Sequence, residues 1–140
     1  MLTENQKTAM RRLFEDNGLN KEDVFTHKHY TIITRSGIEK IQFKSKIAVR
    51  FEVVNCQPDF CVVKAKAYMG SAEIETFGSA KHGHPVKEGD KWRQTGTTEF
   101  WYVMEIAEKR ALSRAVLKIK NLYELEVFGE DETMEDGLDR

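Results

Sequence analysis

The segment of residues 97–122 constrains the fold more than any other part of the chain, because it contains neither glycine nor proline. It is rich in Ala, Leu, Glu, Lys and Arg, which have high helix propensities. A helix of about 24 residues would be roughly 36 Å long, enough to cross a small domain. Thr97 or Thr98 is expected to cap its N-terminus, with Glu99 in the first turn.

Apolar residues are spread around most of this predicted helix. One stripe consists mainly of small or flexible side chains and contains Phe100, Met104, Ala107, Ala111 and Ala115. The polar face is narrow and contains Tyr102, Glu105, Lys109, Ser113 and Lys120. Such a helix is packed on more than one side. We therefore expect it to lie between a sheet and either a further element or a neighbouring subunit.

Three strands are predicted ahead of this helix, at residues 47–56, 60–69 and 72–80, by the alternation of apolar and polar residues. Pro58 and Gly70 favour the two turns between them. In the first strand, the apolar residues of one face are Ile47, Val49, Phe51 and Val53. The sequence therefore predicts an α+β fold. An antiparallel β-meander of three to four strands is covered by one long C-terminal helix, in the order β-β-β-α, with an additional N-terminal helix.

The N-terminal helix is predicted at residues 2–17, where Thr3 and Gln6 form a capping box and Gly18 provides a C-terminal stop. Residues 20–24 are expected to add a helical turn.

A short strand is predicted at residues 30–34, which are rich in β-branched side chains. Ser36 and Glu39 form a second capping box, which predicts a short helix ending near residue 44. The residues of this helix that are expected to face the core are Ile38 and Ile41.

Composition is typical of a globular domain, since 40% of the 140 residues are hydrophobic and 32% are charged. Residues 1–128 are predicted to form one domain, closed by a turn or short strand at residues 122–128. Residues 129–140 are acidic and are expected to be a disordered tail. The formal net charge is −1, and because carboxylates are concentrated in this tail, the remaining body is mildly basic. That distribution is compatible with nucleic-acid binding.

Basic residues of the predicted long helix are the first candidates for ligand contact. Arg110 and Arg114 lie one turn apart, and Lys109 and Lys118 extend the group. Arg and Lys supply the charge and the donors that bind phosphate groups. The alternative is a set of solvated ion pairs, such as Glu105 with Lys109. Weaker candidates from other predicted elements are Lys64, Lys66 and Arg35.

Residues 81–96 are predicted to form a long polar loop, of the kind that is often functional. Trp92 lies there among the basic residues Lys81, Lys87, Lys91 and Arg93. Such a loop could clamp single-stranded nucleic acid, with Trp92 stacking on a base for about 1–3 kcal/mol. The alternative is that Trp92 packs against the body of the domain.

Two further groups have the composition of metal or redox sites. His27 and His29, and likewise His82 and His84, have a spacing that allows metal binding. Cys56 and Cys61 flank the first predicted turn, and we expect reduced thiols, with a disulfide left open.

The string YVMEIAEKRALSRAVLK, preceded by IETFGSA and YTIITRSGIEKI, resembles the single-strand annealing protein superfamily. That superfamily includes the eukaryotic Rad-fifty-two recombination protein and phage relatives of the Erf and Sak kinds. The resemblance covers residues 30–129, and the segment Lys109-Arg110-Ala111-Leu112 looks like the KRAL segment of the family's inner DNA-binding groove. It implies a small sheet followed by a long helix. It also implies single-stranded DNA as ligand and a homo-oligomer, ring or filament. A recombination exonuclease or a single-strand-binding protein is an implied further partner.

No phosphate-binding loop, nucleophile elbow or HExxH motif is present. We therefore expect a protein that is not an enzyme and that uses neither a cofactor nor a metal. The leading hypothesis is single-strand annealing in recombination and repair, in a phage or mobile element. The alternatives are a non-catalytic protein-interaction or regulatory module of a mobile element that keeps the fold without DNA binding, and a metal-dependent enzyme using the histidine pairs. No segment has the length to span a bilayer or the pattern of a secretion signal, so a cytoplasmic location is expected, nucleoid-associated or in a phage-infected cell.

Overall fold

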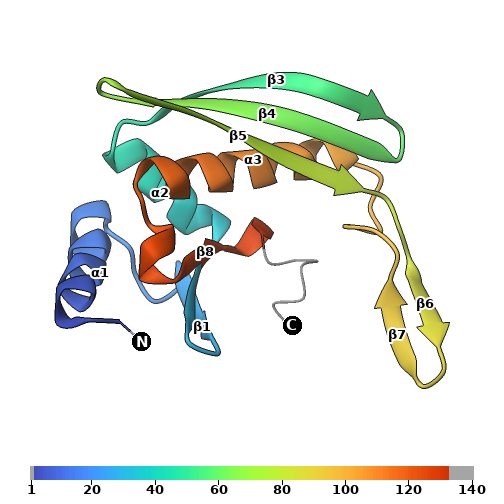
Figure 1. Ribbon diagram of the computed structural model, residues 1–140, viewed down its shortest axis with the longest axis horizontal. Coiled ribbons are helices and arrows are strands. Elements are labelled where there is room, and N and C mark those ends of the chain that lie inside the picture. The colour runs from blue at the N-terminus through green and yellow to red at the C-terminus, as the bar shows by residue number, and fades with distance from the viewer. Residues whose placement is uncertain (1, 133–140) are drawn as a thin grey trace.

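The computed structural model describes residues 2–132 (Figure 1). Its elements, in chain order, are α1 (Glu4–Asn17), β1 (Val24–His27), β2 (Tyr30–Ile33), α2 (Arg35–Lys44), β3 (Ala48–Gln57), β4 (Phe60–Met69), β5 (Ala72–Lys81), β6 (Pro85–Glu88), β7 (Lys91–Gln94), α3 (Val103–Ile119), the 3₁₀ turn η1 (Tyr123–Leu125), β8 (Val127–Gly129) and the 3₁₀ turn η2 (Glu130–Glu132). Predictions for residues 133–140 lie outside the described residues. The first residues of the predicted acidic tail are folded, because Gly129 ends β8 and Glu132 is buried.

The three long strands form the predicted antiparallel meander, in the order β3-β4-β5. Its inner face lies against α3, as Figure 1 shows. The β4 residues that point to the helix are buried and comprise Cys61, Val63, Ala65 and Ala67. An α+β fold with an antiparallel three-stranded sheet and a C-terminal helix is therefore confirmed.

The small-residue stripe of α3 sets the distance between helix and sheet. Ala107, Ala111 and Ala115 are fully buried. The strand opposite them contains Gly78, where an added Cβ would lie 2.3 Å from the Ala107 carbonyl oxygen and from the Ala111 amide nitrogen. Next to this contact, the Thr76 hydroxyl donates to the Ala111 carbonyl oxygen at 2.9 Å. No larger side chain fits at the crossing, so the backbones are in direct contact.

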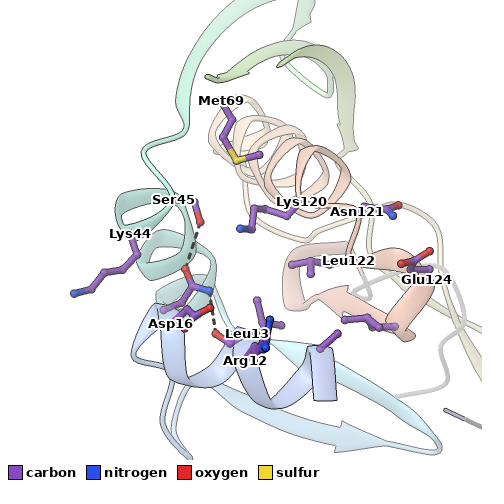
Figure 2. Close-up of a pocket in the computed structure, with 13 residues that line it drawn as sticks. Arg12, Leu13, Asp16, Lys44, Ser45, Met69, Lys120, Asn121, Leu122 and Glu124 are labelled. Carbon is purple, nitrogen blue, oxygen red and sulfur yellow. Dashed lines mark hydrogen bonds between the residues drawn. The ribbon is translucent and has the colours of Figure 1, made fainter. Parts of the chain in front are cut away.

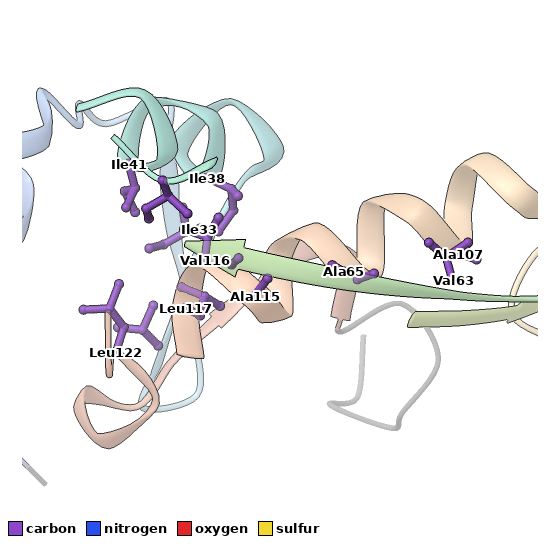
Figure 3. Packing of buried hydrophobic residues seen from close by; sticks show 14 of the residues in the cluster. Ile33, Ile38, Ile41, Val63, Ala65, Ala107, Ala115, Val116, Leu117 and Leu122 are labelled. Carbon is purple, nitrogen blue, oxygen red and sulfur yellow. The ribbon is translucent and has the colours of Figure 1, made fainter. Parts of the chain in front are cut away.

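The other side of α3 is covered by α2, β8 and η2 of the same chain. Figure 3 shows the resulting cluster, with Ile38 and Ile41 of α2 close to Val116 and Leu117 of α3. Ser113, which was predicted to lie on the polar face, is instead buried beneath this cover. Its hydroxyl donates to an Asp131 carboxylate oxygen at 3.3 Å. Of the two predicted arrangements for the helix, the structure shows a sheet on one side and further elements of its own chain on the other.

The predicted start of the long helix was wrong. α3 begins at Val103, and Tyr102 occupies the N-cap position without a side-chain cap. The amides of Thr97 and Thr98 both donate to the Lys81 carbonyl oxygen, at 2.7 and 3.2 Å. The Thr98 hydroxyl accepts from the Phe100 amide at 3.0 Å. These bonds hold residues 97–100 to the end of β5, so they cannot form the first helical turn.

The N-terminal capping box of Thr3 and Gln6 is confirmed, and Gly18 ends α1 with a φ of 64°. The second predicted capping box was wrong, because α2 is capped by Thr34, whose hydroxyl accepts from the Gly37 amide at 3.3 Å. Glu39 pairs with Arg35 at 3.8 Å instead of reaching back to Ser36.

Two further pairings were not predicted. β1 and β2 form an antiparallel hairpin, to which β8 adds in parallel, giving a second sheet in the order β1-β2-β8. Val24, expected to end a helical turn, therefore begins a strand. Residues 81–96 are not an irregular loop, since they contain the β6–β7 hairpin, which projects from one end of the molecule (Figure 1). None of the described helices is both long and apolar enough to cross a membrane.

Candidate nucleic-acid interface

The four cations predicted on the long helix divide into two groups. Arg110, Arg114 and Lys118 follow one another at four-residue spacing and form a row along α3. Lys109 lies about 100° around the helix from Arg110 and outside this row. Arg114 and Lys118 are exposed, whereas Arg110 and Lys109 are partly buried. We call Arg110, Arg114 and Lys118 the cation row.

The C-terminal part of the cation row borders a pocket at the edge of β5. The pocket has a volume of about 260 Å³ and is lined by Glu75, Thr76, Phe77, Arg114, Lys118 and Tyr123. It combines two exposed cations with two aromatic rings, which is a composition suited to a phosphate-bearing ligand. Glu75 places one carboxylate at the same pocket.

Glu132 lies behind the cation row and is buried. It accepts hydrogen bonds from the Tyr123 hydroxyl at 2.7 Å and from the Gly129 amide at 3.2 Å. Burial raises the pKa of Glu132, while these bonds and the charges of Arg114 and Arg110 act in the opposite direction. Burial and the Glu132 carboxylate raise the pKa of Tyr123 as well. Arg110 and Arg114 therefore provide the positive charge beside a buried carboxyl group, in addition to any contact with a ligand.

The lysines predicted on the hairpin lie on the outer face of the sheet, where carboxylates surround them. Lys64 lies 3.3 Å from Glu52 and 3.7 Å from Glu75, and Lys66 lies 3.9 Å from Glu75. The hydrogen bond to Glu52 raises the pKa of Lys64. These ion pairs reduce the positive potential that the two lysines offer to a phosphate backbone. The charge of Arg35 is likewise offset by a carboxylate, because Arg35 pairs with Glu39 on α2.

Trp92 lies on β7, opposite Lys87 of β6, and 68% of its surface is exposed. It does not pack against the body of the domain. Arg93 on the same strand pairs with Glu88 at 2.7 Å. Of the two alternatives for Trp92, the structure shows the one in which the ring is accessible to a ligand.

A second group of exposed rings was missed by sequence reasoning. Phe100, Trp101 and Tyr102 lie just before α3, with exposed fractions of 57%, 66% and 46%. The His82 ring stacks on Trp101 with centroids 3.6 Å apart and an interplanar angle of 13°, and Phe100 stacks on Tyr102 at 5.0 Å and 10°. We call these four residues the aromatic junction. The sequence did contain an indication of this exposure, because three consecutive aromatic residues cannot all lie on one buried face of a helix.

A separate pocket of about 510 Å³ lies between α1, α2 and the C-terminal end of α3 (Figure 2). Its charged lining is mixed, with Arg12, Lys44 and Lys120 on the basic side and Asp16 and Glu124 on the acidic side. It contains none of the predicted site residues, and its balanced charge favours no particular ligand.

The predicted histidine pairs do not gather further ligands. Within residues 2–132, no group of three or more His, Cys, Asp or Glu side chains is arranged to hold a metal ion. His82 stacks on Trp101, and His29 contacts the Tyr30 ring at 4.1 Å. Cys56 and Cys61 are free thiols on directly opposed strand positions, with their sulfur atoms 4.0 Å apart.

Neither a protein-family model, nor a curated protein, nor a solved structure matches this chain.

Proposed function

We propose that this protein binds single-stranded DNA and promotes the annealing of complementary strands, in recombination or repair of a phage or mobile element. The observation that carries the proposal is the cation row, in which Arg114 and Lys118 are exposed on a rigid helix beside an open pocket. The Lys109–Leu112 segment, which resembles the family's DNA-binding groove, contributes Arg110 to the cation row. We place this activity in the cytoplasm, near the nucleoid or in a phage-infected cell.

The proposed mechanism is electrostatic and geometric. Cations of the row contact phosphates and release counterions, so affinity falls with salt, with a slope of about −0.7 per phosphate contact for a single strand. A strand held by its phosphates keeps its base edges accessible. A complementary strand can then pair with it without displacing the protein, and no nucleotide hydrolysis is required.

We propose that several copies assemble side by side and extend the cation row. Support comes from β3, which pairs only with β4 among the described residues. Phe51 and Val53 lie opposite Ala65 and Val63 on the predicted inner face, but they are 42% and 56% exposed because α3 packs mainly on β4 and β5. An unpaired edge strand with exposed apolar side chains is a favourable place for a second chain to bind.

The test is fluorescence anisotropy with labelled single-stranded and duplex oligonucleotides over a series of salt concentrations. The wild type should prefer the single strand. Arg114→Ala/Lys118→Ala should weaken binding at least about tenfold and reduce the salt slope by about 1.4. The matched control is Arg11→Ala/Arg12→Ala, which removes the same charge from exposed positions on α1. If the folded wild type does not bind at low salt, the proposal is wrong.

A second candidate is the non-catalytic protein-interaction module of a mobile element. The exposed apolar edge of β3 favours it, since such an edge serves a protein partner as well as a second copy. A recombination exonuclease or a single-strand-binding protein is the partner to try first. Specific capture of such a partner by a chain that does not bind DNA would favour this candidate.

A further inference from the structure

We propose that the aromatic junction is a stacking site for unpaired nucleobases, with the Trp101 indole as its main contact. This inference rests on the proposed function and specifies how a single strand is distinguished from a duplex. In a duplex the base faces are covered by neighbouring base pairs, so a flat aromatic surface selects bases that are not stacked in a helix.

Three rings of the aromatic junction are exposed although the residue that follows them is buried. Trp101 is 66% exposed and Phe100 57%, while the neighbouring Val103 is only 2% exposed. Leaving large rings in water forgoes the favourable free energy of burying them. A cluster of several such rings is typical of a binding surface rather than of an isolated surface residue.

The geometry of the rings favours a flat ligand. His82 and Trp101 lie nearly parallel at 13°, and Phe100 and Tyr102 at 10°. The other aromatic contacts within residues 2–132 are tilted or edge-on, such as Tyr30 with Phe128 at 83°. The His82 ring supports one face of the indole, and the high exposure of Trp101 leaves room for a further planar group. Nucleobases have the shape and π-surface that suit this arrangement.

Hydrogen bonds hold the aromatic junction in position. The Gly83 amide donates to the Thr98 carbonyl oxygen at 2.8 Å, and the Lys81 amide donates to the Thr97 hydroxyl at 3.0 Å. A ring nitrogen of His82 lies 3.1 Å from the Glu99 carbonyl oxygen. The two strands of chain also meet at Gly83 and Gly96, where an added Cβ on Gly83 would lie 2.2 Å from the Gly96 amide nitrogen. The rings are thus pre-positioned, which lowers the entropy cost of binding.

The surrounding charges agree with a nucleic acid as the occupant. Lys81 ends β5 beside His82, and the hairpin carries Lys87 and Lys91. Three carboxylates lie in the same segments: Glu88 is paired with Arg93 at 2.7 Å, and Asp90 and Glu99 are exposed. Phe100, Trp101 and Tyr102 directly precede α3, the helix that carries the cation row. Arg114 follows Trp101 by thirteen residues, or roughly 20 Å at 1.5 Å per residue, so a single strand would need several nucleotides to contact both sites.

The test compares Trp101→Ala, Trp101→Phe and the wild type in binding to oligothymidine and to an abasic strand of equal length. Trp101→Ala should weaken binding to oligothymidine by about 5- to 160-fold and leave binding to the abasic strand unchanged. Trp101→Phe should recover most of the affinity. The matched control is Phe43→Ala on α2, which removes an aromatic ring that is 80% exposed and should change neither affinity.

A spectroscopic readout reports on the stacking itself. In a Trp92→Phe background, Trp101 is the remaining indole. Oligothymidine should quench its fluorescence, and the abasic strand should not. Circular dichroism and urea unfolding establish that each variant is folded.

Failure of this inference differs from failure of the proposed function. Unchanged DNA binding by Trp101→Ala, with binding still lost in Arg114→Ala/Lys118→Ala, would overturn the stacking site alone. If Trp101→Ala binds DNA normally but self-associates more weakly, the rings contact a second copy of the chain. If it binds DNA normally but binds phosphatidylglycerol vesicles more weakly, the rings contact a lipid surface. No binding of either strand by the wild type would overturn both proposals.

Discussion

Burial couples the ionisation of Glu132 to the folding of the chain. Its carboxyl group is buried against Tyr123 and Gly129, with Arg110 and Arg114 nearby. Because burial raises the pKa of this group above its ordinary value of 4.5, the folded chain binds its proton more tightly than the unfolded chain does. The stabilising contribution of the protonated group is therefore present below the unfolded pKa. It is lost as the pH rises through the folded value.

Glu132→Gln should remove this pH dependence, because an amide does not titrate and still accepts a hydrogen bond. The free energy of unfolding should change less between pH 4 and pH 8 in the variant than in the wild type. The variant should also be the more stable of the two at neutral pH. Urea unfolding at a series of pH values measures this, with Glu124→Gln at an exposed position as control. A wild-type profile that rises through this range and is unchanged by the substitution would contradict the expectation.

Residue types in the sequence indicated which cations could contact DNA, but not which are accessible. Arg110 and Arg114 look equivalent in the sequence, being one turn apart on one helix. In the structure Arg114 is exposed, whereas one terminal nitrogen of Arg110 is buried. The sequence does not show that η2 folds back over α3, where Asp131 accepts from the Ser113 hydroxyl. The ion pairs of Lys64 were likewise not predictable from its own segment, because its partners Glu52 and Glu75 come from two neighbouring strands.

At the scale of elements, the crossing of α3 over β5 depends on one position without a side chain. Gly78 faces the backbone at Ala107 and Ala111, and neither partner has a flexible side chain that could move aside. The Thr76 hydroxyl bond to Ala111 fixes the same crossing. A change in the distance between helix and sheet would disturb the packing along the whole helix, because protein interiors are close-packed.

Gly78→Ala should therefore destabilise the domain by about 3 kcal/mol, which is the upper part of the range for overpacking a core. Ser79→Ala, on the exposed outer face of the same strand, should change stability by less than about 0.5 kcal/mol. Urea unfolding followed by circular dichroism compares the two. Equal stability of Gly78→Ala and the wild type would show that helix and sheet are not in backbone contact.

Local patterns predicted the elements whose signals lie within one segment. Alternation in residues 60–69 identified β4 with its observed bounds, and helical propensity identified the body of α3. The start of α3 was not predictable in this way, because the Thr97 amide is bonded to Lys81, sixteen residues earlier. The pairing of β2 with β8 likewise joins segments from the two ends of the domain.

At the scale of the whole molecule, the surface proposed to bind bases and the edge proposed for self-association lie on different parts of the fold. The hairpin and the aromatic junction lie at one end, and α1 lies at the other (Figure 1). The edge of β3 runs along the sheet, with Phe51, Val53 and Val54 exposed. The formal net charge of −1 gives little overall repulsion between copies, so the proposed self-association would depend on this local surface.

Val53→Lys should weaken self-association, because a charge on an edge strand opposes pairing with a second chain. Sedimentation velocity over a range of concentrations should show a larger species for the wild type and a shift toward the monomer for the variant. Thr8→Lys, at an exposed position on α1, is the control for the added charge. A wild type that is monomeric at every concentration would contradict the proposed assembly.

The sequence by itself determined the α+β class, the meander, the small-residue face of α3 and the first capping box, since each depends on side chains close together in the chain. Only the tertiary structure decided that Arg114 and Lys118 are the exposed cations and that Phe100, Trp101 and Tyr102 are exposed together. Both outcomes depend on hydrogen bonds and burial between distant segments. The energies of such contacts are comparable to local propensities and override them where the two disagree.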